Sequence, residues 1–491
     1  MWWALMRDVR LAFRRSRIQP GYAVPALLIL GLGLGTSVAM LSFVHGLLLR
    51  PIALRHLPRL VTLWSVPVDH VEERSIPPTG AVSCILMNRS IRLLALFGGT
   101  MLWPWPMPQS AEPRGAVVLV PGSASRITLD VPLSAAPASE PQLQLVEDGG
   151  MRQILTPLFS APAEDGGVAT DRRRLVVRLP AQKGETRRLR VGQPAASTVP
   201  TTLFRFEPVD DRTLALWEGD RPVLVYNHGV LSKPGVPADR NRSTYIHPLY
   251  GLDGEVLTDD FPVDHYHHRG LFWAWPHVRT GGREYDLWTI KGVHQRFERW
   301  LAQETRDRAA LFAVENGWYA GDQKILQERA WILVHQADDE ARCIDLEFFW
   351  IPGPEAVTLA GAEGKSYGGL TIRYAPRTDP VITTPLGTGS IDLEMTPLAW
   401  ADYSGRWTGV TQPSGAALFI HPGHPDYPPT WLTRHYGALC IGWPGVEART
   451  FPAGKPIHCR YRVWVHRGMA TKDAIAAAYA AYEAESKARW E

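Results

Sequence analysis

The stretch Cys343-Ile344-Asp345-Leu346-Glu347-Phe348-Phe349-Trp350 alternates between two kinds of side chain. Large apolar residues occupy positions 344, 346, 348 and 350, whereas Asp345 and Glu347 lie between them. Because successive side chains of a strand point to opposite faces of a sheet, this pattern predicts a strand with one face in a core. On the other face, Glu347 could act as a general base opposite a histidine, or the carboxylates could simply face solvent.

Similar strand-like segments recur from about residue 201 onward. The clearest are 222–226, 416–420 and 461–466. Helical periodicity is scarce apart from the alanine-rich run 474–484, which Thr471 can cap. We therefore expect residues 201–491 to form a large antiparallel β-sandwich with a C-terminal α-helix, rather than a Rossmann or TIM-barrel fold.

Shorter alternating segments fill residues 113–200. They are 117–120, 126–131, 143–147, 175–179 and 187–191, separated by Pro, Gly and Ala. This spacing predicts a small β-sandwich of Ig-like type. The region contains no histidine, so we expect an accessory role for it, and the fold class predicted for the whole chain is all-β.

Two apolar segments near the N-terminus predict export. Residues 18–49 carry no charged side chain and follow five arginines, which predicts one transmembrane helix with the rest of the chain outside the cytoplasm. Residues 87–112 have the layout of a secretory signal peptide, with Arg89 and Arg92 ahead of a short apolar run. The two signals cannot act in series, because an inserted first helix would place Met87 outside already.

Two interpretations of these segments stay open. Either the natural protein starts near Met87 and is secreted, or it is anchored in the inner membrane and 91–103 is a buried or interfacial segment. Both predict a periplasmic or extracellular location. The net positive charge comes from 1–86, which hold nine Arg, no Lys and four acids, so the remainder is slightly acidic and no nucleic-acid partner is expected.

The four cysteines show neither a CxxC pattern nor a zinc spacing. Cys440 and Cys459 lie in strand-like segments, where they could form a disulfide or remain buried thiols. The sequence identifies no cofactor.

Residues 264–275, Asp-His-Tyr-His-His-Arg-Gly-Leu-Phe-Trp-Ala-Trp, concentrate the most potential chemistry. In an extended strand His265 and His267 would share one face and His268 the other. Imidazoles beside a carboxylate and indoles can serve as metal ligands, as proton-transfer groups or as part of a sugar-binding surface. A metal site would need a third ligand, for which His247, His421 and His424 are candidates.

Other polar turns are weaker candidates. Lys365 and Tyr367 lie on a Gly-rich turn and could contact a polyol or carboxylate, but the Walker spacing of a phosphate loop is missing. Asp402 follows Trp400 in a second polar turn that could also contact a substrate. The alternative is a structural β-hairpin in which the Trp side chain is packed. No GxSxG motif is present, which disfavours a nucleophilic serine.

The opening of the chain resembles the start of MacB-like ABC-transporter permeases. The resemblance is carried by 6–15, 20–22, 48–51 and 60–64. It implies a permease-like fragment over 1–64, followed by a linker over 65–86. Transport is not implied, because the periplasmic core and further spans of such a permease do not follow.

A second resemblance covers about 205–468 in collinear order. It is carried by 226–228, 247–250, 264–275, 368–370, 400–405, 421–425 and 461–468, which together look like the bacterial family labelled methane oxygenase PmoA, or PmoA-like. The resemblance implies an uncharacterised exported protein. Methane oxidation is not carried over, because nothing after residue 103 could cross a bilayer.

The aromatic-rich strands are also similar in style to galactose-mutarotase-like supersandwiches. That analogy implies a histidine acid and a carboxylate base acting on a sugar ring. The catalytic roles would fall to His265, His267, His268, Arg269 and Glu347. Substrate binding would fall to His247, Trp273, Lys365, Tyr367, Asp402, His421 and His424.

We therefore expect a protein that binds or processes carbohydrate, by epimerisation, hydrolysis or elimination. A metal-dependent oxidoreductase using His265, His267 and either His421 or His424 is one alternative. A non-catalytic glycan-binding protein is the other.

Overall fold

The computed structural model describes residues 114–491, apart from 122–123, 137–141, 149–152, 180–185 and 192–201. The predicted permease-like fragment (1–64), linker (65–86) and signal-peptide-like segment (87–112) lie outside the described residues. Within the described ranges, no helix is long and apolar enough to span a membrane.

Strands dominate the described residues, and the all-β prediction is confirmed. The predicted C-terminal helix is present as α4 (Lys472–Glu485), and Thr471 caps it by accepting a hydrogen bond from the backbone N–H of Ala474 at 3.2 Å. A single 3-10 turn, η3, spans Ala238–Arg240.

Two nine-stranded antiparallel sheets make up the larger domain. Sheet 1 contains, in spatial order, β22 (Thr396–Pro397), β25 (Thr430–Arg434), β26 (Ala438–Gly442), β19 (Gly369–Arg373), β11 (Leu271–Ala274), β10 (Tyr245–Leu249), β9 (Arg221–Asn227), β8 (Thr213–Glu218) and β7 (Phe204–Pro208). Sheet 2 contains β14 (His294–Thr305), β15 (Ala309–Ala320), β16 (Gln323–His335), β17 (Ala341–Pro352), β28 (Ile457–Arg467), β24 (Ser414–Ile420), β23 (Trp400–Trp407), β20 (Arg377–Thr384) and β21 (Gly387–Gly389). A smaller sheet contains β13 (Arg283–Tyr285), β12 (His277–Thr280), β18 (Val357–Ala360) and β27 (Arg449–Phe451).

The main core lies between sheets 1 and 2. On β17, Ile344, Leu346, Phe348 and Trp350 all belong to it and are at most 1% exposed, as the alternation predicts. Sheet 1 contributes Trp273, whose ring centroid lies 4.5 Å from that of Phe348. Burial of each such side chain stabilises the fold by roughly 1.5–3 kcal/mol. The thiols of Cys440 on sheet 1 and Cys459 on sheet 2 are buried and free.

A buried carboxylate joins four neighbouring strands of sheet 2. Glu328 on β16 is 0% exposed and accepts hydrogen bonds from Gln295 Nε2, Asn316 Nδ2, Trp318 Nε1 and Trp350 Nε1, at 2.8–3.2 Å. Burial raises the pKa of this carboxyl, and the hydrogen bonds from Trp318, Asn316 and Gln295 oppose that shift. Without Glu328, the indole N–H groups of Trp318 and Trp350 would be left buried without a partner, whereas Asn316 and Gln295 would keep longer hydrogen bonds to Tyr226 and to the carbonyl of Trp273.

The N-terminal sandwich is formed by strands before residue 192 together with the end of the chain. It contains β2 (Arg126–Pro132), β5 (Val168–Arg178), β4 (Gln153–Pro162), β3 (Gln142–Glu147), β6 (Arg187–Val191), β1 (Arg114–Val120) and β29 (Arg489–Trp490). The sequence pattern did not predict β4, which pairs with β3 through its first half and with β5 through its second.

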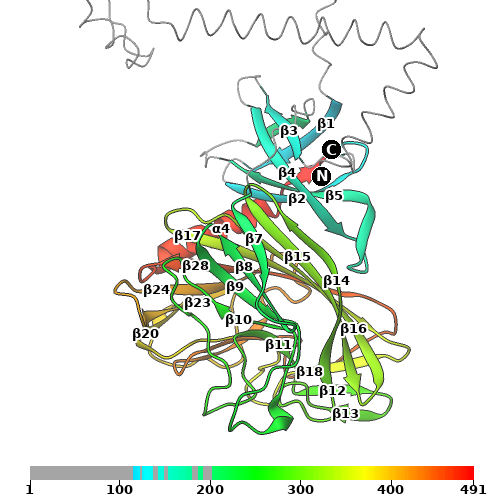
Figure 1. The fold of residues 1–491 in the computed structure, drawn as a ribbon, viewed down its shortest axis with the longest axis vertical. Coiled ribbons are helices and arrows are strands. Elements are labelled where there is room, and N and C mark those ends of the chain that lie inside the picture. The colour runs from blue at the N-terminus through cyan, green and yellow to red at the C-terminus, as the bar shows by residue number, and fades with distance from the viewer. Residues whose placement is uncertain (1–113, 122–123, 137–141, 149–152, 180–185, 192–201) are drawn as a thin grey trace, which may run out of the picture. The chain divides into compact units, whose positions relative to one another are not determined.

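The outer face of sheet 2 is covered by two elements. Phe159 and Val176 of the N-terminal sandwich pack against Trp331 and Phe349 of sheet 2. Helix α4 packs against β24 and neighbouring strands, and Figure 1 shows it lying beside β24 and β28. Both faces of sheet 2 are therefore buried over much of their area.

We expect Glu328→Ala to lower the free energy of unfolding by at least about 3 kcal/mol, because it leaves two buried indole N–H donors without an acceptor and opens a cavity in the core. Urea denaturation followed by tryptophan fluorescence measures the change. The exposed Glu284→Ala is the matched control and should change stability by less than about 1 kcal/mol. If the two variants lose the same free energy of unfolding, the hydrogen bonds to Glu328 stabilise the fold no more than the exposed contacts of Glu284 do.

Candidate functional site

The histidine block forms a turn and not the predicted strand. The backbone N–H of His265 donates to the carbonyl of Pro262 at 3.0 Å, and that of His268 donates to His265 at 2.8 Å. Strand β11 begins only at Leu271. A Cβ atom on Gly270 would lie 2.2 Å from the carbonyl oxygen of Ile246, so glycine allows the turn to approach β10 closely.

This turn brings three imidazoles together, and we call His265, His267 and His268 the imidazole cluster. The rings of His265 and His268 stack with centroids 4.6 Å apart and planes at 8°. The ring of His267 stands edge-on to both, at 5.7 and 4.6 Å. The prediction that His268 points away from the other two is therefore wrong, because it assumed an extended backbone.

The cluster lies on the outer face of sheet 1. Trp273 contacts Phe348 of sheet 2 and so faces the core, which makes the neighbouring Phe272 of β11 face the opposite way. His268 lies 6.0 Å from Phe272 and 5.5 Å from Trp288, measured between ring centroids. Trp273 is 0% exposed, so its predicted contact with a substrate is wrong.

Two tyrosines with accessible surface flank the cluster. Tyr436 is 41% exposed and stacks on His265 with centroids 5.2 Å apart. Tyr367, which the sequence singled out, is half-buried and lies 4.7 Å from the ring of Trp288. Neither Tyr436 nor Trp288 was predicted, because both come from loops that only the fold brings to the histidines.

A carboxylate and an arginine orient His265. Its Nδ1 lies 3.0 Å from Asp264 Oδ2, and Arg373 Nη2 donates to both oxygens of Asp264 at 2.8 and 2.9 Å. Burial alone would raise the pKa of Asp264, but the contacts with His265 and Arg373 outweigh it and lower this pKa. Asp264 is thus an ionised partner that can stabilise a proton on His265.

The other two imidazoles are held in the neutral form. Burial, with the nearby charge of Arg242, lowers the pKa of His267 to about 3. Burial and the neighbouring histidines lower the pKa of His268 well below its ordinary value. Each neutral ring has one nitrogen that can accept a hydrogen bond or a proton, and Nδ1 of His268 has no partner among the described residues.

Arg269 and His247 lie beneath this turn. Arg269 is 0% exposed, contacts Asp260 at 3.4 Å and lies 3.4 Å over the ring of Phe261, so it braces the turn from inside and is no candidate for substrate contact. His247 Nδ1 lies 3.1 Å from the Thr258 hydroxyl, and burial lowers its pKa to about 4.

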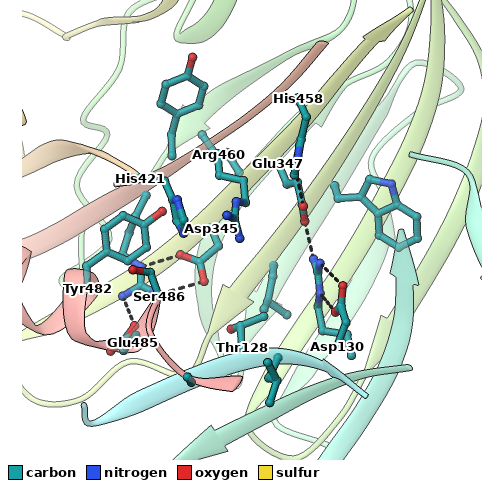
Figure 2. A pocket seen from close by; sticks show the side chains of 18 residues that line it. Thr128, Asp130, Asp345, Glu347, His421, His458, Arg460, Tyr482, Glu485 and Ser486 are labelled. Carbon is teal, nitrogen blue, oxygen red and sulfur yellow. Dashed lines mark hydrogen bonds and ion pairs between the residues drawn. The ribbon is translucent and has the colours of Figure 1, made fainter. Parts of the chain in front are cut away.

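Glu347 and His421 lie elsewhere, in a pocket of about 370 Å³ on the outer face of sheet 2 (Figure 2). Arg174 of the N-terminal sandwich donates to Glu347 Oε2 at 2.7 Å, and His458 contacts Oε1 at 2.8 Å. Burial opposes ionisation, yet these partners hold the pKa of Glu347 well below its usual range. Glu347 is therefore an interdomain ion-pair partner and not the predicted general base.

Three remaining candidates also lie apart from the cluster. His424 is buried with Nε2 3.2 Å from the Tyr461 hydroxyl. Asp402 is 0% exposed and contacts His466 Nε2 at 2.9 Å, which makes it a structural group. Lys365 lies on an exposed turn.

The three-histidine metal set proposed from the sequence is not assembled. His421 lies against Tyr482 of α4 and His424 against Tyr461 of β28, whereas His265 and His267 lie outside sheet 1. Over the described ranges, no group of three or more His, Cys, Asp or Glu side chains has the arrangement of a metal site.

Comparisons with known proteins give a family but no activity. Residues 213–480 match the model of a family described as "Family of unknown function (DUF6807)". No curated protein matches the sequence. Among solved structures, the chain is similar to galactose 1-epimerase from Lactobacillus acidophilus NCFM, with 10% identity and a TM-score of 0.23, over 55% of this chain and 100% of that one.

We expect the free energy of unfolding to fall as the pH falls from about 6.5 toward 3. The folded-state pKa of His267 is about 3, against 6.5 for a free histidine, so the unfolded chain takes up this proton first. His267→Gln should flatten the pH dependence in that window. Urea titrations at a series of pH values measure it, with the half-exposed His277→Gln as the control for removing a histidine. An unchanged slope in His267→Gln would contradict the assignment.

We expect Glu347→Gln to destabilise the fold by about 3 kcal/mol, because it leaves the buried Arg174 with one carboxylate partner fewer. Thermal unfolding measures the change, and Glu340→Gln, at an exposed residue just before the same strand, is the control. If both variants have the same unfolding temperature as the wild type, the interdomain ion pair is not a stabilising contact.

Proposed function

Since this chain belongs to the DUF6807 family, a family of unknown function, its residues must supply the assignment, and we propose that it binds and processes a carbohydrate at the imidazole cluster. One observation carries the proposal. Three imidazoles are in ring contact, one is aligned by Asp264, and two partly exposed tyrosines flank them.

The chemistry of the cluster suits proton transfer on a polyol. Asp264 contacts Nδ1 of His265, which leaves Nε2 to take a proton from a substrate hydroxyl or carbon, while the carboxylate stabilises the imidazolium. The neutral rings of His267 and His268 can hydrogen-bond to hydroxyl groups. Epimerisation, hydrolysis and elimination all need such a step.

The tyrosines supply the apolar part of a sugar site. One face of a sugar ring presents C–H groups, which pack on aromatic rings, and Tyr436 and Tyr367 offer accessible ring surface at the cluster. The N-terminal segments support export, so the ligand we propose is a periplasmic or extracellular glycan. The resemblance to PmoA-like proteins stays a prediction.

We expect His265→Ala to lower turnover of a bound glycan by about 10²–10⁴-fold, the usual contribution of a general acid or base, while binding changes by only a few fold. Asp264→Asn should lower turnover as well, since it removes the charge that stabilises the imidazolium. Titration calorimetry against a panel of oligosaccharides, followed by product analysis of the glycans that bind, measures both quantities.

The matched control is His277→Ala, which removes a histidine that also contacts a carboxylate, Glu284, at 2.6 Å. It should leave binding and turnover unchanged. Binding without turnover, unaffected by His265→Ala, would identify a glycan-binding protein without catalysis. A failure of the wild type to bind any glycan would refute the proposal.

A further inference from the structure

Arg242 is a buried cation with unused donors beside the imidazole cluster. Its side chain is 4% exposed, and Nη2 donates to the carbonyls of Leu287 and Trp288 at 2.6 and 2.9 Å. Nε and Nη1 have no hydrogen-bond partner among the described residues. Burial lowers the pKa of Arg242 to about 9, which still leaves the guanidinium charged at pH 7.

The other buried arginines of this chain show that Arg242 lacks a carboxylate partner. Seven arginines are buried in the described ranges, and six of them contact a carboxylate. The pairs are Arg174–Glu347, Arg187–Glu147, Arg269–Asp260, Arg342–Glu218, Arg373–Asp264 and Arg462–Asp345. Arg242 forms no such pair with any described residue, although an unpaired buried charge is costly.

Arg242 lines a cavity. The space of about 220 Å³ is also lined by Asp239, Asn241, Ser243 and Gln295, and the side-chain carbonyl oxygen of Asn241 has no hydrogen-bond partner among the described residues. A carboxylate-sized group fits a cavity of this volume. A polar, roomy cavity with unsatisfied donors is the kind of place where a ligand group replaces water.

Arg242 lies close to the proposed site. Its charge is among those that lower the pKa of His267 and of His268. Its guanidinium carbon lies 5.2 Å from the ring centroid of Phe272, and that ring lies 6.0 Å from the ring of His268. A second cation, Arg373, contacts Asp264 and lies 4.7 Å over the ring of Tyr436. Of these two arginines beside the cluster, only Arg373 is paired with a carboxylate among the described residues.

We propose that the carbohydrate recognised at the imidazole cluster is acidic, and that its anionic group, a carboxylate as in a uronic acid, binds Arg242. This proposal rests on the proposed function and narrows it to one substrate class. A charge-assisted hydrogen bond to a buried guanidinium contributes enough to favour the acidic sugar by about 10-fold or more over its neutral counterpart.

Titration calorimetry on the full chain tests the proposal with matched ligand pairs. The pairs are oligogalacturonate against galacto-oligosaccharide, and a glucuronate-containing oligosaccharide against the corresponding glucan fragment, with a sulfated oligosaccharide to separate carboxylates from sulfates. The wild type should bind the uronates about 10-fold or more tightly than the neutral sugars. Tighter binding of the sulfated sugar alone would overturn the carboxylate assignment.

Arg242→Met should abolish the preference for the acidic sugar, and Arg242→Lys should keep part of it. The control, Arg279→Met, removes a partly exposed arginine that pairs with Glu284 at 2.9 Å and should keep the full preference. If Arg242→Met does not fold, the affinities of the wild type for the matched acidic and neutral sugars still test the proposal. Equal affinity for acidic and neutral sugars overturns this inference but leaves the proposed function standing. If no sugar binds, both the proposed function and this inference are overturned. If Arg242→Met keeps the wild-type preference for the acidic sugar, Arg242 does not bind the anionic group.

Discussion

Sheet 2 is covered on both faces, and this constraint determines what its charged side chains can do. Its inner face meets sheet 1, and its outer face meets the N-terminal sandwich and α4. Asp345 and Glu347 on that outer face must therefore be paired, and they are, with Arg462 and Arg174. Their ionisation is stabilised so strongly that they cannot accept a proton near neutral pH. The proton-transfer chemistry that we propose therefore falls to the outer face of sheet 1.

Local patterns predicted the elements well. The alternation in 343–350 identified the core face of β17, and Thr471 was identified as the cap of α4, because both depend only on neighbouring residues. The histidine turn was missed because the same residue types fit a strand and a turn equally well. Strand β4 was missed because it changes partners halfway, between β3 and β5.

Long-range contacts account for the errors in the candidate site. The sequence could mark Glu347 as a carboxylate on a strand, but its partner Arg174 is 173 residues away, and that contact makes it structural. Conversely, no sequence motif marks Tyr436 or Arg373, although both residues complete the surroundings of His265. The imidazoles themselves were found from the sequence alone, because they lie within four residues of the chain.

The pairing of β29 with β1 joins the last residues of the described chain to the first. Val118 and Leu119 pair with Trp490 and Arg489, and Ala484 of α4 enters the core of the N-terminal sandwich. Synthesis proceeds from the N-terminus, so strands β1 to β6 emerge from the ribosome before the two larger sheets, and yet the sandwich lacks part of its sheet and core until residues 484–490 have been translated. The folding of this domain is thereby deferred until after the larger domain has been synthesised, and a chain interrupted before β29 leaves the edge of β1 unpaired.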